Sequence, residues 1–351
     1  METVRLGKTE MIVSKLGFGS IPIQRVSEDK AVAVVRRCLE LGISFIDTAN
    51  AYTTSEERIG KAISGRRDGL VLATKSTART REEMERHLKL SLKRLGVEFI
   101  DLYQFHGVND FKTLDVVLDP NGPMAVVEQA KRAGVVKHIG ITSHSMDTAK
   151  EAIKSDRFET IMFSFNFIAC EPADELLPLA REHDVGFIAM KPLAGGMLDN
   201  VTIAFKYLFQ FPDVVPIPGI EKIPEIEEII QVLKGPWQMT EAEKGEMKRL
   251  RKELGTQFCR RCDYCQPCPE EISISIVMFS SSLFKRLPPE RIFSGMVAEA
   301  LEKAANCTEC GECEERCPYH LPIREMISEQ VKRYQEEKRK YQGQGALGNH
   351  V

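Results

Sequence analysis

Along the first 235 residues, two patterns of apolar and polar positions alternate. Short, mainly apolar runs predict buried strands, and stretches with apolar residues three and four positions apart predict amphipathic helices. After a first strand that ends at Gly17 and Gly19, the predicted strands span residues 44–49, 70–75, 100–106, 137–143, 160–167, 186–192 and 214–220. The predicted helices span residues 28–41, 55–63, 81–95, 124–133, 146–154, 173–183, 201–211 and 224–233.

The order of these elements predicts an α/β fold. Strands that alternate with helices and are nearly continuous in apolar residues indicate a parallel sheet covered on both faces. Eight such units indicate closure into a (β/α)8 TIM barrel, which takes about 250 residues. The opening RLGKTEMIVSK has two short β-like runs around a polar turn, so we expect an N-terminal β-hairpin that caps the barrel floor.

The pattern changes at Lys234-Gly235-Pro236, where we place a domain boundary. The charged stretch 240–255 is helix-prone, and residues 322–341 predict one long amphipathic helix. We therefore expect a barrel domain at residues 1–235, a small and mainly α-helical domain at 236–340, and a flexible tail at 341–351.

Charge and composition argue against several classes of partner. The chain has 351 residues, of which 43% are hydrophobic, and 48 basic against 51 acidic residues give a net charge of -3. Because the two signs are well mixed, no basic field indicates a nucleic acid or a membrane surface as partner. The sequence has neither a long uninterrupted apolar run nor a signal-peptide pattern, so we expect a cytoplasmic protein.

Eight of the ten cysteines fall in two runs near the C-terminus. Such crowding indicates metal ligation in a reducing compartment more than disulfide bonds. Each run ends in Cys-Pro, and the two runs are Cys259, Cys262, Cys265 and Cys268, followed by Cys307, Cys310, Cys313 and Cys317.

The second run has the CxxCxxCxxxCP spacing of bacterial ferredoxins, in which three close thiolates hold one 4Fe-4S cluster and the distant fourth ligates the other. By this rule, Cys317 joins the first three cysteines of the first run, and Cys268 joins the first three of the second. The first run is one residue shorter before its last cysteine, so an altered ligand set or a single retained cluster are alternatives to two clusters. Zinc held by four thiolates is the competing interpretation. The 38-residue helical stretch between the runs is typical of a helical ferredoxin-like domain.

Four polar residues stand at or just after the C-terminal ends of predicted strands, the face on which such barrels carry their chemistry. They are Asp47, Tyr52, Lys75 and His106. Each residue alone would more often be structural, but four in register favour a catalytic site.

The segments FIDTANAY, LATKS, LYQFHG and VVPIPG resemble the marker segments of the aldo-keto reductase family, in chain order and at the ends of the right strands. The resemblance covers about residues 1–235. It implies that Tyr52, Asp47, Lys75 and His106 reduce a carbonyl with hydride from a nicotinamide dinucleotide, without a metal.

Elementary chemistry agrees with these roles. A tyrosine has an unperturbed pKa of about 10, so it holds its proton at neutral pH and releases it reluctantly. An ammonium such as that of Lys75 would stabilise the phenolate and allow Tyr52 to protonate the carbonyl oxygen as hydride arrives. Asp47 would orient Lys75, and His106 would donate a hydrogen bond to the carbonyl oxygen.

The resemblance also implies a dinucleotide site. Gly219 and Lys222, in PIPGIEK, resemble the family's phosphate loop, where backbone N–H groups and a cation receive phosphate. We expect further cofactor contacts from residues at other strand ends and loops, namely Gly19, Ser20, Ser143, His144, Asn166, Pro192, Leu193 and Glu225.

Several positions depart from the family's pattern. Glu225 stands where many members have Arg or Gln near the adenosine phosphate, and Ile229 replaces a usual Asn. Because a carboxylate repels a 2'-phosphate and accepts from a ribose hydroxyl, NAD(H) is an alternative to NADP(H). His144 stands in place of a usual Asn, Met162 in place of a common Gln, and Met190 in place of a stacking aromatic residue.

The whole chain resembles a subgroup of aldo-keto reductases with a C-terminal ferredoxin-like domain, found in anaerobes. We expect NAD(P)H-dependent reduction of a small aldehyde or ketone, with clusters that act in structure, in docking of a redox protein, or as a one-electron relay. Hydride carries two electrons and a cluster accepts one, so direct exchange needs a mediator such as flavin, for which the sequence has no motif. The alternative is an electron-transfer iron-sulfur protein whose barrel is a non-catalytic nucleotide-binding scaffold.

Overall fold

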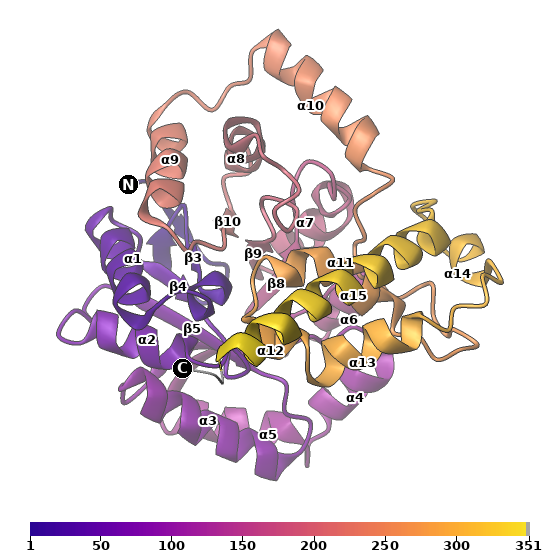
Figure 1. Cartoon of the computed structure of the whole chain (residues 1–351). Coiled ribbons are helices and arrows are strands. Elements are labelled where there is room, and N and C mark those ends of the chain that lie inside the picture. Colours follow the sequence, from indigo (N-terminus) through magenta and orange to yellow (C-terminus); the bar gives the residue numbers. More distant parts are fainter. Residues whose placement is uncertain (349–351) are drawn as a thin grey trace. The chain divides into compact units, whose positions relative to one another are not determined.

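The computed structural model describes residues 1–348, which form two compact units (Figure 1). The first unit ends at Arg249 and the second begins at Leu250. Each unit has a hydrophobic core of its own, so each is described by itself.

Eight parallel strands build the first unit and neighbour one another in chain order. The ends of this sheet are joined by backbone hydrogen bonds from Gly17 N to Pro216 O at 3.0 Å and from Gly19 N to Pro218 O at 2.8 Å. The predicted (β/α)8 barrel is therefore confirmed. The strands are β3 (Phe18–Gly19), β4 (Phe45–Asp47), β5 (Val71–Ser76), β6 (Ile100–Phe105), β7 (Val136–Thr142), β8 (Thr160–Ser164), β9 (Gly186–Met190) and β10 (Val214–Ile217).

Helices alternate with these strands as the apolar spacing predicts. Two elements of the first unit were not predicted, namely the 3-10 helix η1 (Ile21–Gln24) and the helix α4 (Phe111–Leu118), which follows the capping residue Asp110. The predicted helices are present as α1 (Glu28–Glu40), α2 (Ser55–Ile63), α3 (Arg81–Leu95), α5 (Pro123–Arg132), α6 (Met146–Lys154), α7 (Pro172–Glu182), α8 (Val201–Phe209) and α9 (Ile223–Lys234).

Six of the strands end one to three residues earlier than predicted, and β8 shows why. Its ladder stops at Ser164, whereas the apolar run continues to Phe167. Phe165 and Phe167 are fully buried, but they lie in a loop that Asn166 organises through its side-chain oxygen. The apolar pattern reports burial rather than strand pairing, so a buried loop lengthens the predicted strand.

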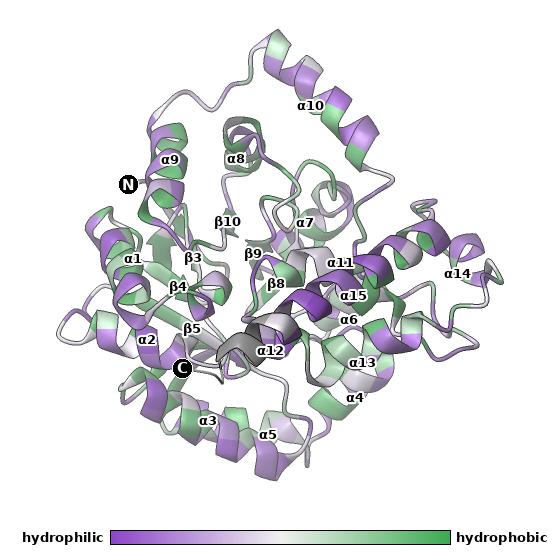
Figure 2. Cartoon of the chain, viewed as in Figure 1, coloured by the Kyte–Doolittle hydropathy of each residue, from purple (hydrophilic) through white to green (hydrophobic). Residues whose placement is uncertain are grey.

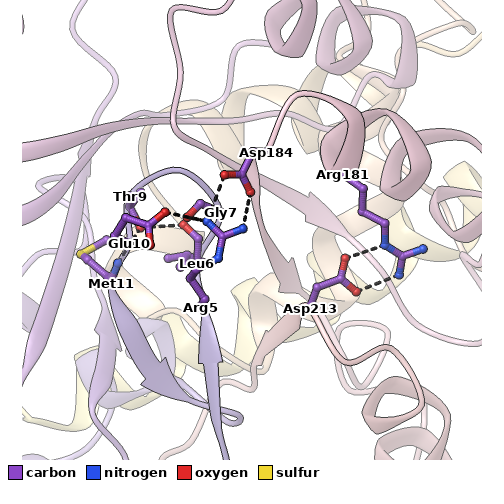
Figure 3. A network of polar contacts seen from close by, with 9 residues as sticks. All are labelled: Arg5, Leu6, Gly7, Thr9, Glu10, Met11, Arg181, Asp184 and Asp213. Atoms are coloured by element: carbon purple, nitrogen blue, oxygen red, sulfur yellow. Dashed lines mark hydrogen bonds and ion pairs between the residues drawn. The ribbon is translucent and has the colours of Figure 1, made fainter.

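The predicted N-terminal hairpin is present as β1 (Thr3–Arg5) and β2 (Ile12–Ser14), paired antiparallel. The Arg5 guanidinium donates to both carboxylate oxygens of Asp184, at 2.7 and 2.9 Å, just before β9 (Figure 3). The hairpin's apolar side chains pack into one cluster with those of the barrel strands, including Val4, Leu6, Val13, Phe45, Leu102 and Val215. The hairpin thus covers the end of the barrel at which the strands begin.

The chain beyond α9 stays with the first unit longer than the predicted boundary at residue 235. Trp237 packs on Phe209 with a ring distance of 5.4 Å and donates to Leu233 O at 3.0 Å. In the first turn of α10 (Glu241–Leu254), Glu243 pairs with Lys206 of α8 at 2.7 Å. Helix α10 is largely hydrophilic (Figure 2) and buries none of its residues.

The second unit is helical between Leu250 and Gly348, and no strand occurs among these described residues. Its apolar core includes Ile274, Val277, Leu301, Leu321 and Ile327. After α10, its helices are α11 (Ile274–Phe284), α12 (Pro289–Ile292), α13 (Gly295–Ala304), α14 (Glu312–Glu315) and α15 (Ile323–Gly348).

Helix α15 overlaps the predicted flexible tail at 341–351, because it continues to Gly348. Residues 349–351, on which the rest of that prediction falls, lie outside the described residues. Within residues 1–348, no helix combines the length and the apolar character needed to cross a membrane.

Candidate active site and cluster ligands

A buried ion pair joins the ends of two neighbouring barrel strands. The Lys75 ammonium on β5 donates to Asp47 Oδ2 on β4 at 2.5 Å and to the backbone oxygen of Thr48 at 2.8 Å. The side chains of Lys75 and Asp47 are only 2% and 4% exposed. Burial lowers the pKa of Lys75, but the Asp47 carboxylate and the Tyr52 phenol raise it by more, so its pKa lies above the ordinary value and Lys75 keeps its charge.

The other oxygen of the same carboxylate is held from a third strand. Gln104 Nε2, on β6, donates to Asp47 Oδ1 at 2.9 Å, and Gln104 is fully buried. The sequence did not predict this role for Gln104, because nothing in an apolar strand shows what a single Gln within it contacts. Its inward direction follows only from the register, which pairs Gln104 with Lys75 on β5.

Tyr52 reaches this pair from the turn that follows β4. The Lys75 nitrogen lies 5.1 Å from the centre of the Tyr52 ring. The His106 ring packs edge-on against Tyr52, with ring centres 5.9 Å apart. The structure therefore brings the four predicted residues together, whereas their catalytic roles stay predictions.

Backbone contacts fix the turn that carries Tyr52. Asn50 N donates to Lys75 O, and Tyr52 N donates to Ala49 O, both at 2.9 Å. Thr53 has a positive φ of 29°, an unusual conformation for a β-branched residue, and its hydroxyl donates to Gln24 Oε1 at 2.7 Å. These contacts hold the Tyr52 backbone against the ends of β4 and β5.

His106 is likewise held through its backbone. Its N–H donates to Ser76 O at 2.9 Å, and the Arg79 guanidinium donates to its carbonyl oxygen at 2.8 Å. Gly107 N donates to the Thr142 hydroxyl at 2.8 Å. The loop after β6 is thus held against both neighbouring strands, and these contacts fix the position of the His106 backbone from which the imidazole extends.

Several predicted cofactor residues lie at the same end of the barrel, engaged with the protein itself. Ser143 is buried and donates to Ser145 O at 3.2 Å, and His144 N donates to Asn109 Oδ1 at 2.8 Å. The Ser20 hydroxyl is buried and lies 2.9 Å from that of Ser55. The hydroxyls of Ser20 and Ser143 thus support neighbouring loops.

The Asn166 amide makes three contacts to backbone groups. Its nitrogen donates to Lys191 O at 2.9 Å, and its oxygen accepts from the N–H groups of Ile168 and Ala169 at 2.9 Å. This arrangement joins the loop after β8 to the end of β9, directly before Pro192 and Leu193. A structural role therefore accompanies the predicted cofactor role of Asn166.

The predicted phosphate loop lies beside the first strand. Gly19 and Gly219 form a parallel bridge, and a side chain at Gly219 would meet Pro22 at 2.9 Å. Glu225 Oε2 accepts from the N–H groups of Glu221 and Lys222 at 2.9 and 3.1 Å. The carboxylate therefore occupies N–H groups at the start of α9 that the sequence interpretation assigned to phosphate.

In the second unit, the cysteines surround two cavities of similar size, with empty volumes of about 360 and 330 Å³ that are partly open to solvent. Cys265, Cys268, Cys307, Cys310 and Cys313 line the first. The second is lined by Cys259, Cys262, Cys265 and Cys317. Apart from Cys265, which lines both cavities, the cysteines divide into the two crossed sets that the ferredoxin spacing predicts.

The chemistry of these thiols fits a cationic group between them. Burial raises the pKa of the Cys262 and Cys313 thiols to about 11, so their thiolates need a neighbouring cation. Among residues 1–348, no three His, Cys, Asp or Glu side chains converge as ligands of a single metal ion do. The sulfurs instead surround wider cavities, an arrangement that fits a 4Fe-4S cube.

Comparisons with known proteins match a family to each of the two parts of the chain. The model of the aldo/keto reductase family matches residues 15–202, and that of a 4Fe-4S dicluster domain matches residues 258–322. The uncharacterized oxidoreductase YqkF of Bacillus subtilis is 31% identical over 212 residues, which cover 56% of this chain and 67% of that protein. L-galactose dehydrogenase of Arabidopsis thaliana is 30% identical over 217 residues, with coverages of 56% and 67%.

Solved structures give the same picture. The holo form of aldo-keto reductase AKR11C1 from Bacillus halodurans matches with a TM-score of 0.62 and 26% identity, over 71% of this chain and 96% of that chain. An aldo/keto reductase from Klebsiella pneumoniae in complex with NADP and acetate shares the fold, with a TM-score of 0.60, 22% identity and coverages of 71% and 95%. The chain therefore belongs to the aldo/keto reductase family and carries a 4Fe-4S dicluster domain in its C-terminal region.

Proposed function

We propose that the first unit reduces an aldehyde or ketone to an alcohol with NADH or NADPH. The observation that carries this proposal is the buried Asp47–Lys75 pair beside Tyr52, at the end of the barrel where the strands stop. A charged lysine next to a phenol is the arrangement that general acid catalysis of carbonyl reduction needs.

When bound, the dinucleotide would supply a hydride, that is, one hydrogen nucleus with two electrons, to the carbonyl carbon. Tyr52 then donates its hydroxyl proton to the carbonyl oxygen, and the Lys75 ammonium stabilises the phenolate that remains. Asp47 holds Lys75 in its charged form and fixes its position. His106 donates a hydrogen bond to the same carbonyl oxygen and orients the substrate.

The residues proposed to hold the dinucleotide follow the ends of five barrel strands. The nicotinamide end would meet Ser143, His144 and Asn166, and the phosphates would lie near Gly219 and Lys222. The Klebsiella relative's complex with NADP supports a dinucleotide in this fold. Glu225, engaged at the start of α9, favours NADH over NADPH because its carboxylate repels a 2'-phosphate. The remaining proposed contacts are Gly19, Ser20, Pro192 and Leu193.

For the second unit we propose two 4Fe-4S clusters. Cys259, Cys262, Cys265 and Cys317 would hold one cluster, and Cys268, Cys307, Cys310 and Cys313 the other. Cys310 is exposed, which favours exchange of electrons with a redox protein over a purely structural role. The partner of the barrel would be a small carbonyl compound.

The test is the single substitution Tyr52→Phe, which removes one hydroxyl. With 4-nitrobenzaldehyde and either dinucleotide, kcat should fall about 10²- to 10⁴-fold while dinucleotide binding is unchanged. Tyr207→Phe, in an aromatic cluster with Phe165 and Phe211, is the matched control and should keep full activity. Full turnover by Tyr52→Phe would contradict the proposal and favour the alternative of a non-catalytic nucleotide-binding barrel.

A further inference from the structure

The Gln104 side chain spans the interior of the barrel to reach the candidate site. It starts on β6, passes the neighbouring strand β5, and donates to Asp47 Oδ1 on β4 at 2.9 Å. In the same interior, Lys75 donates to Asp47 Oδ2. The carboxylate is therefore clamped from both sides, by one charged donor and one neutral donor.

The neighbouring strand leaves room for this reach. Gln104 pairs in register with Gly140 on β7. A Cβ at Gly140 would lie 3.0 Å from Gln104 Cγ and 2.2 Å from the Thr160 hydroxyl, so a side chain there would push against both. Because residue 140 is glycine, the Gln104 side chain has room to lie fully buried beside it.

The clamp leaves one polar atom without a bond. Gln104 Oε1 is buried and has no hydrogen-bond partner among residues 1–348. A carboxylate only accepts hydrogen bonds, so the amide must turn its nitrogen to Asp47 and its oxygen away. An unpaired buried acceptor lowers the stability of the fold. Such a cost calls for an explanation, and a functional role for the amide nitrogen of the same side chain would provide one.

We propose that Gln104 is a positioning residue for carbonyl reduction, holding the Asp47 carboxylate ionised and turned toward Lys75. This inference rests on the proposed function of the barrel. With Oδ1 fixed, the carboxylate cannot rotate away from the ammonium. Lys75 therefore stays both charged and placed beside Tyr52, the group that gives up the proton.

The titratable groups that face this carboxylate are few. Lys75 contacts it directly, Tyr52 lies beside Lys75, and His106 packs on Tyr52. Loss of the Gln104 donor makes protonation of Asp47 easier, because a buried carboxylate with fewer hydrogen bonds is harder to ionise. The acid side of the pH–kcat profile should then move to higher pH.

Two substitutions test the proposal. Gln104→Met keeps the length of the side chain without the donor, and kcat should fall on the order of 10²-fold, with dinucleotide binding unchanged and the acid limb moved to higher pH. Gln104→Glu restores a donor only when its carboxyl is protonated, so its activity should fall as pH rises through the titration of that carboxyl. A role in packing alone would produce neither pH effect.

Thr160→Val is the control, because it removes a different fully buried polar group in the same interior and should keep the wild-type profile. The proposal would be overturned if Gln104→Met kept the wild-type kcat and pH profile. It would also be overturned if Gln104→Met and Gln104→Glu each lost activity and dinucleotide binding to the same extent. If Gln104→Met and Tyr52→Phe both keep full turnover, the proposed function of the barrel and the role of Gln104 both fail. If Tyr52→Phe collapses while Gln104→Met does not, only the role of Gln104 fails.

Discussion

Asp47 and Lys75 carry opposite charges and are buried in contact with each other. The charged form of each is stabilised in the interior by the charge of the other. Removing one partner of such a pair leaves an uncompensated charge in the interior, whereas removing both leaves none. The pair therefore serves two purposes: it keeps the barrel mouth stable, and it holds a cation next to Tyr52.

For this pair we predict strong coupling between two substitutions. Lys75→Met should lower the free energy of unfolding by about 3–5 kcal/mol, because Asp47 stays buried without its cation. Lys75→Met combined with Asp47→Asn should recover most of that loss. Trp237, the only tryptophan, lies in the first unit and reports its unfolding in denaturant. Equal instability of the single and the double variant would show that the charges are not coupled.

A second prediction at this scale concerns the choice of dinucleotide. Glu225→Gln removes the negative charge and keeps an acceptor for the N–H groups of Glu221 and Lys222. The ratio of kcat/KM for NADPH to that for NADH should rise on the order of tenfold, which corresponds to about 1.4 kcal/mol. Glu228→Gln, on an exposed position of the same helix, is the control. An unchanged ratio in Glu225→Gln would mean that the carboxylate does not face the 2' position.

Single residues show where sequence reasoning succeeds and where it stops. Asp47, Lys75 and His106 were predicted because parallel strands end at the same edge, so polar residues at strand ends must meet. Gln104 was missed because its role depends on strand register and on an empty position at Gly140. The capping contacts of Glu225 were missed because Lys222 precedes the helix, where Ser, Thr, Asp or Asn is the usual signal.

At the scale of elements, polar contacts join neighbouring βα units. Glu159, which precedes β8, lies 2.7 Å from His138 Nδ1 on β7 and 2.5 Å from the Lys131 ammonium on α5. It also accepts from Ile139 N at 3.0 Å. Burial alone would raise the pKa of Glu159, but these hydrogen bonds outweigh it and lower the pKa to about 2.

This depressed pKa predicts a pH dependence of stability. The ionised carboxylate favours the folded state above its ordinary pKa of 4.5, and its contribution is lost as pH falls toward about 2. Glu159→Gln should therefore destabilise the first unit by up to about 3 kcal/mol near pH 7. The difference from wild type should shrink as pH falls below 4.5, which denaturation at several pH values measures. A difference that does not change with pH would contradict this assignment.

The elements also show why helices were predicted better than strand ends. Helix α3 begins after the capping residue Thr80 and ends at Gly96 with a φ of 65°, so both ends carry a local signal. The loop after β8 carries none, because Phe165 and Phe167 are as apolar as strand residues. Helix α4 was missed because residues 107–122 were interpreted as a connection between β6 and the next helix.

At the scale of the whole molecule, the chain combines two units with separate cores and separate chemistry. The sequence predicted both from a change of apolar pattern and from cysteine spacing. The position of the division was less predictable, because Trp237 and Glu243 bind residues 236–243 to the barrel through side-chain contacts.

The two cysteine sets predict how the iron content of the protein changes when single cysteines are replaced. Cys317→Ser and Cys310→Ser remove a ligand from different cavities, so each should lower the iron content to about half of wild type. Cys170→Ser, outside both sets, should leave it unchanged. Carbonyl reduction by the barrel should persist in all three, since its proposed site uses no metal. Complete loss of iron in one variant would indicate a single cluster or a different ligand set.

Tracing the hydride is the most direct test of carbonyl reduction in the barrel. Anaerobically purified protein is given dinucleotide that carries deuterium at both C4 positions, together with 4-nitrobenzaldehyde, and the alcohol is examined by mass spectrometry. We predict one deuterium on the carbinol carbon, with formation slowed at least 10²-fold by Tyr52→Phe. Alcohol without deuterium, or deuterated alcohol formed at the same rate by Tyr52→Phe, would contradict the proposed site.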